Sequence, residues 1–118
     1  MNSEVFDQFS LGVDIEDISR FKKLVFKQNQ SFYKKIFHKN EIKYCLSKPN
    51  PYQHFAARFC AKEALIKAAK KKVTNLAAIE VKFASRKPFI VWNKKKYLLS
   101  LAHEKNKAIA FVIINNEK

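Results

Sequence analysis

The spacing of apolar residues predicts one long helix in the middle of the chain, Tyr52–Lys72, with the sequence YQHFAARFCAKEALIKAAKKK. The segment is rich in alanine, the strongest helix former. Pro49 and Pro51 stand just before it or at its start, where proline is common. It is the longest helical pattern in the sequence, and we interpret the other elements as arranged around it.

The faces of this helix differ in chemistry. At about 100° per residue, Phe59, Glu63 and Lys67 lie along one stripe. Arg58 and Lys62 form a second stripe beside it. One interpretation is a surface helix with a Glu63–Lys67 ion pair, worth only ~0.2–0.5 kcal/mol. The other is that the lone acid, Glu63, serves a site.

An apolar segment near the N-terminus, Phe9–Ile15, predicts a strand that ends near Asp14, after a polar lead-in over residues 1–8. An acid at the end of a buried strand is costly unless it is paired or binds a cation. The alternative is that Asp14 caps the following helix. Gly12 is the only glycine of the chain, so tight turns must use other residues.

Three shorter helical patterns precede the long helix. The first begins at Glu16, and a short turn covers Phe32–Phe37. A third helix starts at His38, with Glu41 in the position of a capping box, and stops at Ser47–Pro51.

The second half of the chain predicts strands. Alternation of apolar and polar residues, bounded by polar turns, indicates a meander. Helices in the first half and an antiparallel sheet in the second predict an α+β fold in a single domain, residues 1–118. The expected strands are Ala77–Ala84, Phe89–Trp92, Tyr97–Ala102 and Ala108–Asn115.

The positive net charge of the chain indicates that its binding partners are anionic. The chain carries 24 Lys and Arg against 10 Asp and Glu, a net charge of +14. Such a field attracts nucleic acid, nucleotides, acidic proteins or anionic membranes without choosing among them. The two cysteines lack the spacing of a disulfide framework or a zinc site. No apolar run is long enough for a membrane span and no signal peptide is recognisable, so we expect a cytoplasmic protein.

Asp14 and Glu63 together suit a hard cation such as Mg²⁺, and nearby basic groups suit a diphosphate. The ordered set of motifs is more specific than this pair. It resembles the holo-acyl-carrier-protein synthases, the short single-domain group of the 4′-phosphopantetheinyl transferases. The motifs are Gly12-Val13-Asp14, the run RFCAKEA at Arg58–Ala64 followed by Lys67, and Ser100-Leu101-Ala102-His103.

The resemblance implies transfer of 4′-phosphopantetheine from coenzyme A to a serine of apo-acyl carrier protein, with Mg²⁺. Asp14 and Glu63 match the metal ligands, and Lys67 matches the lysine at the reacting phosphates. These three residues are the candidate catalytic set. Arg58, Lys62, Lys67 and His103 are the candidate groups around the coenzyme A phosphates.

The resemblance also implies partners. Arg20, Lys23 and Lys27 on the first helix are expected to meet the acidic carrier protein. The fold is expected to be an antiparallel sheet wrapped around a long central helix, in a homotrimer with sites between subunits. The usual glycine turn after Lys67 is missing from this chain, and we hypothesise that Lys70–Lys72 replace its backbone contacts with charge.

Three alternatives remain open. A basic nucleic-acid-binding module fits the charge and the aromatic residues, but the lysines are spread along the chain without a known motif. A metal nuclease could use Asp14 and Glu63, although the acids do not form a compact nuclease pattern. A catalytically inactive family member kept for binding would fit the missing glycines. Binding to a membrane is not expected.

Overall fold

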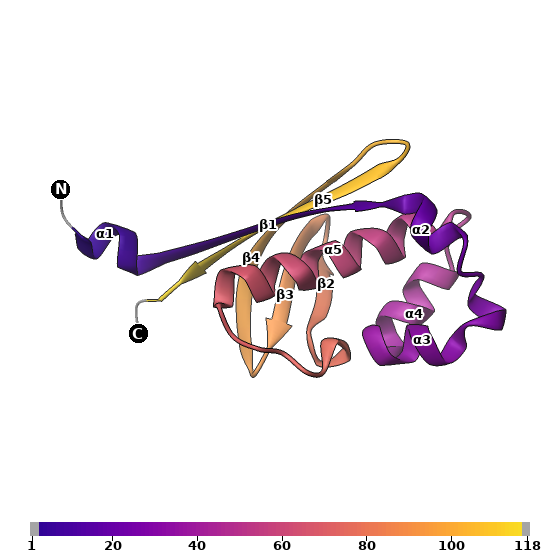
Figure 1. Ribbon diagram of the computed structural model, residues 1–118, viewed down its shortest axis with the longest axis horizontal. Helices are drawn as coiled ribbons and strands as arrows, with labels where there is room; N and C mark the ends of the chain where they lie inside the picture. The colour runs from indigo at the N-terminus through magenta and orange to yellow at the C-terminus, as the bar shows by residue number, and fades with distance from the viewer. Residues whose placement is uncertain (1–2, 117–118) are drawn as a thin grey trace.

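A five-stranded antiparallel sheet in the order β1-β5-β4-β3-β2 forms one layer, and the long helix α5 (Pro51–Ala69) lies across one of its faces (Figure 1). The computed structural model describes residues 3–116. The α+β class with a sheet packed around a long helix is confirmed. The strands are β1 (Phe9–Asp17), β2 (Glu80–Ala84), β3 (Lys87–Trp92), β4 (Lys95–His103) and β5 (Lys107–Asn115).

The short helices gather mainly at one end of α5. Helices α2, α3 and α4 cover the start of α5, whereas α1 lies at the far end of β1 (Figure 1). The capping box predicted at His38 is confirmed, because its Nδ1 accepts from Asn40 N at 3.0 Å and Glu41 Oε1 accepts from His38 N at 2.9 Å. The helical segments are α1 (Ser3–Gln8), α2 (Ile18–Lys22), α3 (Gln30–Ile36), α4 (Lys39–Leu46) and the 3₁₀ turns η1 (Phe26–Gln28) and η2 (Leu76–Ala78).

The first strand runs further than the sequence suggested. We expected it to end near Asp14, but β1 continues to Asp17 because the full length of β5 pairs with it, with Asp14 opposite Ala110. Asp17 takes the N-cap position of α2, so the interpretation of Asp14 as a helix cap is wrong. The polar lead-in is helical from Ser3 to Gln8.

The long helix ends earlier than predicted. It stops at Ala69, and Lys70 adopts a left-handed conformation with φ 55° while its N–H donates to Ile66 O. This is the usual way to close a helix, with lysine at a position that favours glycine. Ser85, Asn93 and Lys94 also have positive φ, so the expectation that turns use residues other than glycine is confirmed.

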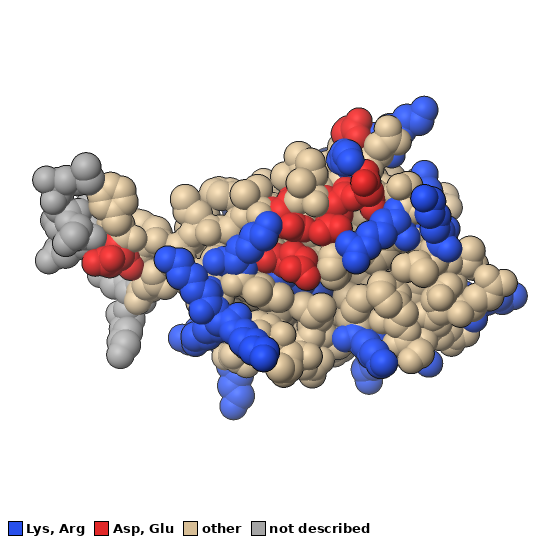
Figure 2. Space-filling view, viewed as in Figure 1, with Lys and Arg blue, Asp and Glu red and all other residues tan. Residues whose placement is uncertain are grey.

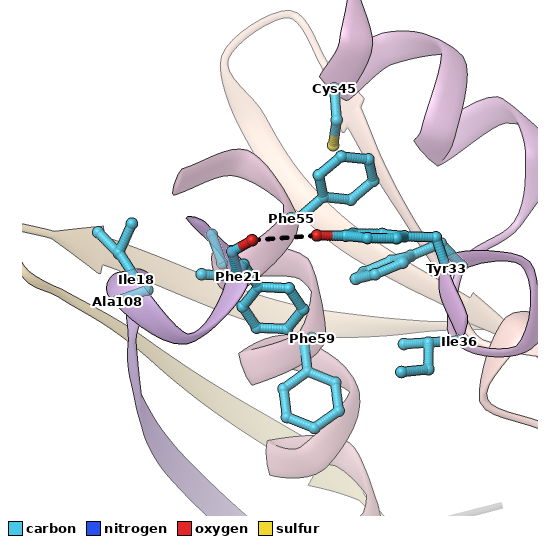
Figure 3. Close-up of a cluster of buried hydrophobic side chains, with 11 residues drawn as sticks. Ile18, Phe21, Tyr33, Ile36, Cys45, Phe55, Phe59 and Ala108 are labelled. Carbon is cyan, nitrogen blue, oxygen red and sulfur yellow. Dashed lines mark hydrogen bonds between the residues drawn. The ribbon is translucent and has the colours of Figure 1, made fainter. Parts of the chain in front are cut away.

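The core has two parts that follow one another along α5. In the first part, an aromatic cluster packs the short helices against the first half of α5 (Figure 3). The Tyr33 hydroxyl in this cluster is shared between the carbonyls of Phe21 and Leu24, at 3.2 and 2.6 Å. The second part lies between α5 and the sheet, where small side chains such as Ala61 and Ala64 let the two layers approach closely.

Candidate functional site

The site is built where β1 crosses α5. A Cβ on Gly12 would lie 1.9 Å from the carbonyl oxygen of Ala64 and 2.8 Å from the nitrogen of Ala68, so this crossing requires glycine. Two residues further, the Cys60 thiol donates to the carbonyl of Asp14 at 3.0 Å. The β1 backbone is therefore fixed directly on α5, with the Asp14 side chain beside the helix.

The crossing brings Asp14, Glu63 and Lys67 together. Lys67 Nζ donates to Asp14 Oδ1 at 3.0 Å and to the carbonyl of Val13 at 3.1 Å. Burial and then the charge of Asp14 raise the pKa of Glu63. Asp14 and Glu63 therefore lie close enough for the charge of one to act on the other, and basic side chains flank the acidic group in Figure 2. Among residues 3–116, the ion pair of Lys67 is with Asp14 and not with Glu63.

Glu16 is a member of this cluster that the sequence reasoning missed. Burial, followed by a hydrogen bond to Asp14 and the charge of Asp14, raises the pKa of Glu16 to about 7. Arg20 Nη1 donates to Glu16 Oε1 at 3.1 Å. Had the strand been extended to Asp17, the period-two alternation of β1 would have placed Glu16 on the same face as Asp14.

The acidic cluster leaves coordination capacity for a cation. Asp14 Oδ2 is buried and has no hydrogen-bond partner among the described residues. In this part of the chain, no group of three or more His, Cys, Asp and Glu side chains forms a complete metal cage. Such a site suits Mg²⁺, which is commonly held by one or two carboxylates together with water and substrate phosphates.

Arg58 packs on aromatic rings of α4 and β2, and no ion pair among residues 3–116 joins Arg58 or His103 to an acid. Arg58 is buried, its guanidinium carbon is 4.4 Å from the centre of the Tyr44 ring, and its Nη1 donates to His54 O at 3.4 Å. His103 is exposed at the end of β4. Burial, then Arg58, Lys48 and His103 lower the pKa of His54. The charges of Arg58, Lys48 and His103 therefore all act on His54, and these residues form a second, basic group.

The position of Lys62 corrects one prediction. Its side chain is fully buried, and Nζ donates to Glu41 Oε1 at 2.6 Å and to the carbonyls of Ile36, Leu76 and Ile79 at 2.9, 3.1 and 2.7 Å. Every N–H of the ammonium is engaged inside the protein, so none is left for a phosphate. The assignment of Lys62 to phosphate binding is wrong, because the α4–β2 side of α5 is covered.

The residues expected to meet a carrier protein lie on the surface beside the acids. Arg20, Lys23 and Lys27 are exposed along α2 and η1. The Arg20 guanidinium carbon lies 5.5 Å from the centre of the Phe59 ring, and its charge also acts on Glu63. A basic surface therefore borders the acidic cluster directly.

Comparison with known proteins identifies the family of this chain. A family model described as the 4′-phosphopantetheinyl transferase superfamily matches residues 10–113. A holo-[acyl-carrier-protein] synthase of Thermodesulfovibrio yellowstonii is 45% identical over 108 residues, covering 88% of this chain and 96% of the relative. The corresponding protein of Chlamydia caviae is 39% identical, covering 87% and 93%.

A solved structure shares the fold. The holo-(acyl-carrier-protein) synthase of Bacillus anthracis, in complex with CoA (3′,5′-ADP), superposes with a TM-score of 0.77 at 28% identity, covering 92% of this chain and 96% of that one. Within residues 3–116, no helix combines the length and apolar character needed to span a bilayer.

Proposed function

The chain belongs to the 4′-phosphopantetheinyl transferase superfamily, and we infer that its activity is that of a holo-[acyl-carrier-protein] synthase. It transfers the 4′-phosphopantetheine group of coenzyme A to a serine of apo-acyl carrier protein and releases adenosine 3′,5′-bisphosphate. The observation that carries this function is the convergence of Asp14, Glu63 and Lys67 where β1 crosses α5.

The reaction requires stabilisation of the negative charge that develops on the leaving phosphate. The serine oxygen forms a bond to the phosphorus that carries pantetheine, and the bond from this phosphorus to the bridging diphosphate oxygen breaks. We propose that Lys67 stabilises the negative charge on the leaving phosphate, since its side chain is half exposed beside Asp14.

We propose that Asp14 and Glu63 hold Mg²⁺, with water and substrate phosphates as the remaining ligands. Burial and then the charge of Asp14 raise the pKa of Glu63, and Asp14 Oδ2 is buried without a hydrogen-bond partner among the described residues; both observations support a cation beside these groups. When bound, Mg²⁺ neutralises diphosphate charge and fixes the geometry of the phosphates. Arg58 and His103 are proposed to bind phosphates of the nucleotide end of coenzyme A.

A mass-spectrometric assay tests the activity. The protein is mixed with apo-acyl carrier protein, coenzyme A and Mg²⁺, and the carrier is weighed. We expect a mass gain of one phosphopantetheine with the wild type and its loss in Asp14→Asn and Glu63→Gln. Glu104→Gln, a surface acid in the β4–β5 turn, is the matched control and should remain active. No gain with the wild type would refute the proposed function.

We further propose that the protein is a homotrimer with sites between subunits. The sheet face opposite α5 carries rows of apolar side chains, in which Val13 pairs with Phe111 and Ile15 pairs with Ile109. Val13 is 54% and Ile15 58% exposed, which is unusual for a sheet face in water. A neighbouring copy would bury this face and could bring the basic Arg58 group of one subunit to the acids of another.

Oligomeric state can be measured directly. Sedimentation should give a trimer for the wild type and a smaller species for Phe111→Asp. Lys82→Asp on an exposed position of β2 is the matched control for an added acid. A monomeric wild type at assay concentration would exclude the trimer.

The carrier protein is proposed to dock on α2 and η1. Arg20, Lys23 and Lys27 offer positive charge beside the acidic site, and the chain has a net charge of +14. Reversing Lys23 and Lys27 to Glu should raise KM for the carrier while KM for coenzyme A stays constant. An unchanged KM for the carrier would place docking elsewhere.

We also propose a cytoplasmic location, because the chain belongs to the 4′-phosphopantetheinyl transferase superfamily.

A further inference from the structure

Three basic side chains gather around the ring of Tyr44. The guanidinium carbon of Arg58 lies 4.4 Å from the centre of the ring, and Lys48 Nζ lies 4.7 Å from it. The imidazole of His54 meets the same ring edge-on, at 5.9 Å between centres and an interplanar angle of 84°. We call these four residues, with Phe83, the Tyr44 cluster.

Phe83 provides a second aromatic ring in contact with the Arg58 guanidinium. Its ring is nearly parallel to that of Tyr44, with 15° between the planes and 6.3 Å between the centres, and the guanidinium carbon lies 5.3 Å from its centre. Cations are attracted to the electron-rich faces of aromatic rings. The two rings can therefore hold positive charge in place without a carboxylate.

The cluster has little internal compensation for its charge. Arg58 Nε is buried with no hydrogen-bond partner among residues 3–116, and no ion pair there includes Lys48 or Arg58. Burial and then the charges of Arg58 and Lys48 lower the pKa of His54, because both cations disfavour a further positive charge beside them. A buried unpartnered donor among like charges is typical of a place that receives an anion.

Two acids line the same pocket as Arg58, but both have other partners. Glu41 binds Lys62 at 2.6 Å, and its second oxygen accepts from Val81 N at 3.0 Å. Glu80 Oε1 lies 3.9 Å from His38 Nε2. Neither carboxylate forms an ion pair with Arg58.

Buried contacts among Lys62, Glu41 and Val81 hold the Tyr44 cluster in place. Glu41 precedes Tyr44 by three residues on α4, and Lys62 follows Arg58 by four residues on α5, so each pair shares a helix face. Val81 precedes Phe83 by two residues on β2, so they share a strand face. The buried Lys62–Glu41–Val81 contacts thus hold together the three elements that carry Arg58, Tyr44 and Phe83.

We propose that Tyr44, supported by Phe83, is a positioning residue whose ring holds Arg58 and Lys48 to bind a phosphate group of the coenzyme A nucleotide. The proposal rests on the proposed function, because that function supplies the ligand. Tyr44 acts through the two cations and not on the reacting phosphorus. Its loss should therefore weaken nucleotide binding and leave the chemical step intact.

The test compares Tyr44→Leu with Tyr44→Phe, which keeps the ring. The dissociation constant for adenosine 3′,5′-bisphosphate is measured by calorimetry at fixed ionic strength, and kcat and KM for coenzyme A are measured in parallel. Tyr44→Leu should weaken binding and raise KM roughly three- to tenfold, as expected for lost cation–π contacts, with kcat within about twofold. Tyr44→Phe should restore binding close to that of the wild type.

Controls keep the result interpretable. Tyr97→Leu removes a partly buried tyrosine of β4 that contacts Trp92 of β3 and does not belong to the Tyr44 cluster. This variant should bind adenosine 3′,5′-bisphosphate as the wild type does. If Tyr44→Leu fails to fold, Phe83→Leu, at an exposed strand position, should show a weaker form of the same loss. Unchanged binding by a folded and active Tyr44→Leu enzyme would overturn this proposal alone. A wild type without transferase activity would overturn the proposed function as well.

Discussion

Replacing Lys62 with methionine tests whether this lysine belongs to the core or to the substrate site. Methionine is similar in length and fits an apolar site, but it removes the ammonium that donates to Glu41 and three backbone carbonyls. Lys62 is 0% exposed and Glu41 is 2% exposed. The variant therefore leaves a buried carboxylate with no counter-charge.

The expected effect on stability is large. Removing one partner of a buried ion pair costs about 3–5 kcal/mol. In a domain of this size each kcal/mol shifts Tm by roughly 3–5 °C, so we expect Tm to fall by about 10–20 °C. Urea unfolding and thermal melting measure it directly. Lys67→Met is the matched control, because that side chain is half exposed and its loss should barely change Tm.

A second variant identifies the cause. Adding Glu41→Gln to Lys62→Met removes the buried charge and keeps an amide that can still hydrogen-bond, so about half of the lost stability should return. The sequence-based assignment makes the opposite prediction, in which Lys62→Met keeps Tm and raises KM for coenzyme A. If the melting temperature of Lys62→Met stays within about 1 °C of the wild type, the placement of this lysine in a buried ion pair is refuted.

Three further predictions use other parts of the site. Gly12→Ala should lower Tm by about 10 °C or more and reduce activity, because its Cβ would lie 1.9 Å from the Ala64 carbonyl; a calorimetric scan with Tm unchanged would contradict the close crossing. Since burial and Asp14 raise the pKa of Glu16 to about 7, the native state binds a proton that the unfolded state releases, so metal-free protein should gain stability as pH falls from about 8 to 5. Glu16→Gln should flatten that dependence in urea titrations, and an equally steep curve would argue against it. Replacing Lys70–Lys72 with Ala should raise KM for coenzyme A with little change in Tm, as these side chains lie outside α5; an unchanged KM would remove the charge hypothesis.

The sequence alone was sufficient for the strongest features. The helix beginning at Pro51, the capping box at His38 and the strands of the second half follow from local periodicity and capping, which act over a few residues. The motif around Glu63 was also recognisable in the sequence, through its resemblance to the family that the comparisons identify. The pairing of Asp14 with Glu63 was predicted from the ordered motifs.

Tertiary contacts decided the rest. Lys62 and Glu63 are neighbours in one motif, yet one is buried in an ion pair and the other faces the site, because α5 is covered by α4 and β2 on one side and crossed by β1 on the other. Glu16 joined the acids because β5 extended β1 to Asp17, a pairing between the two ends of the chain. Local patterns fix which side chains share a face of an element, but only packing between distant segments determines what that face meets.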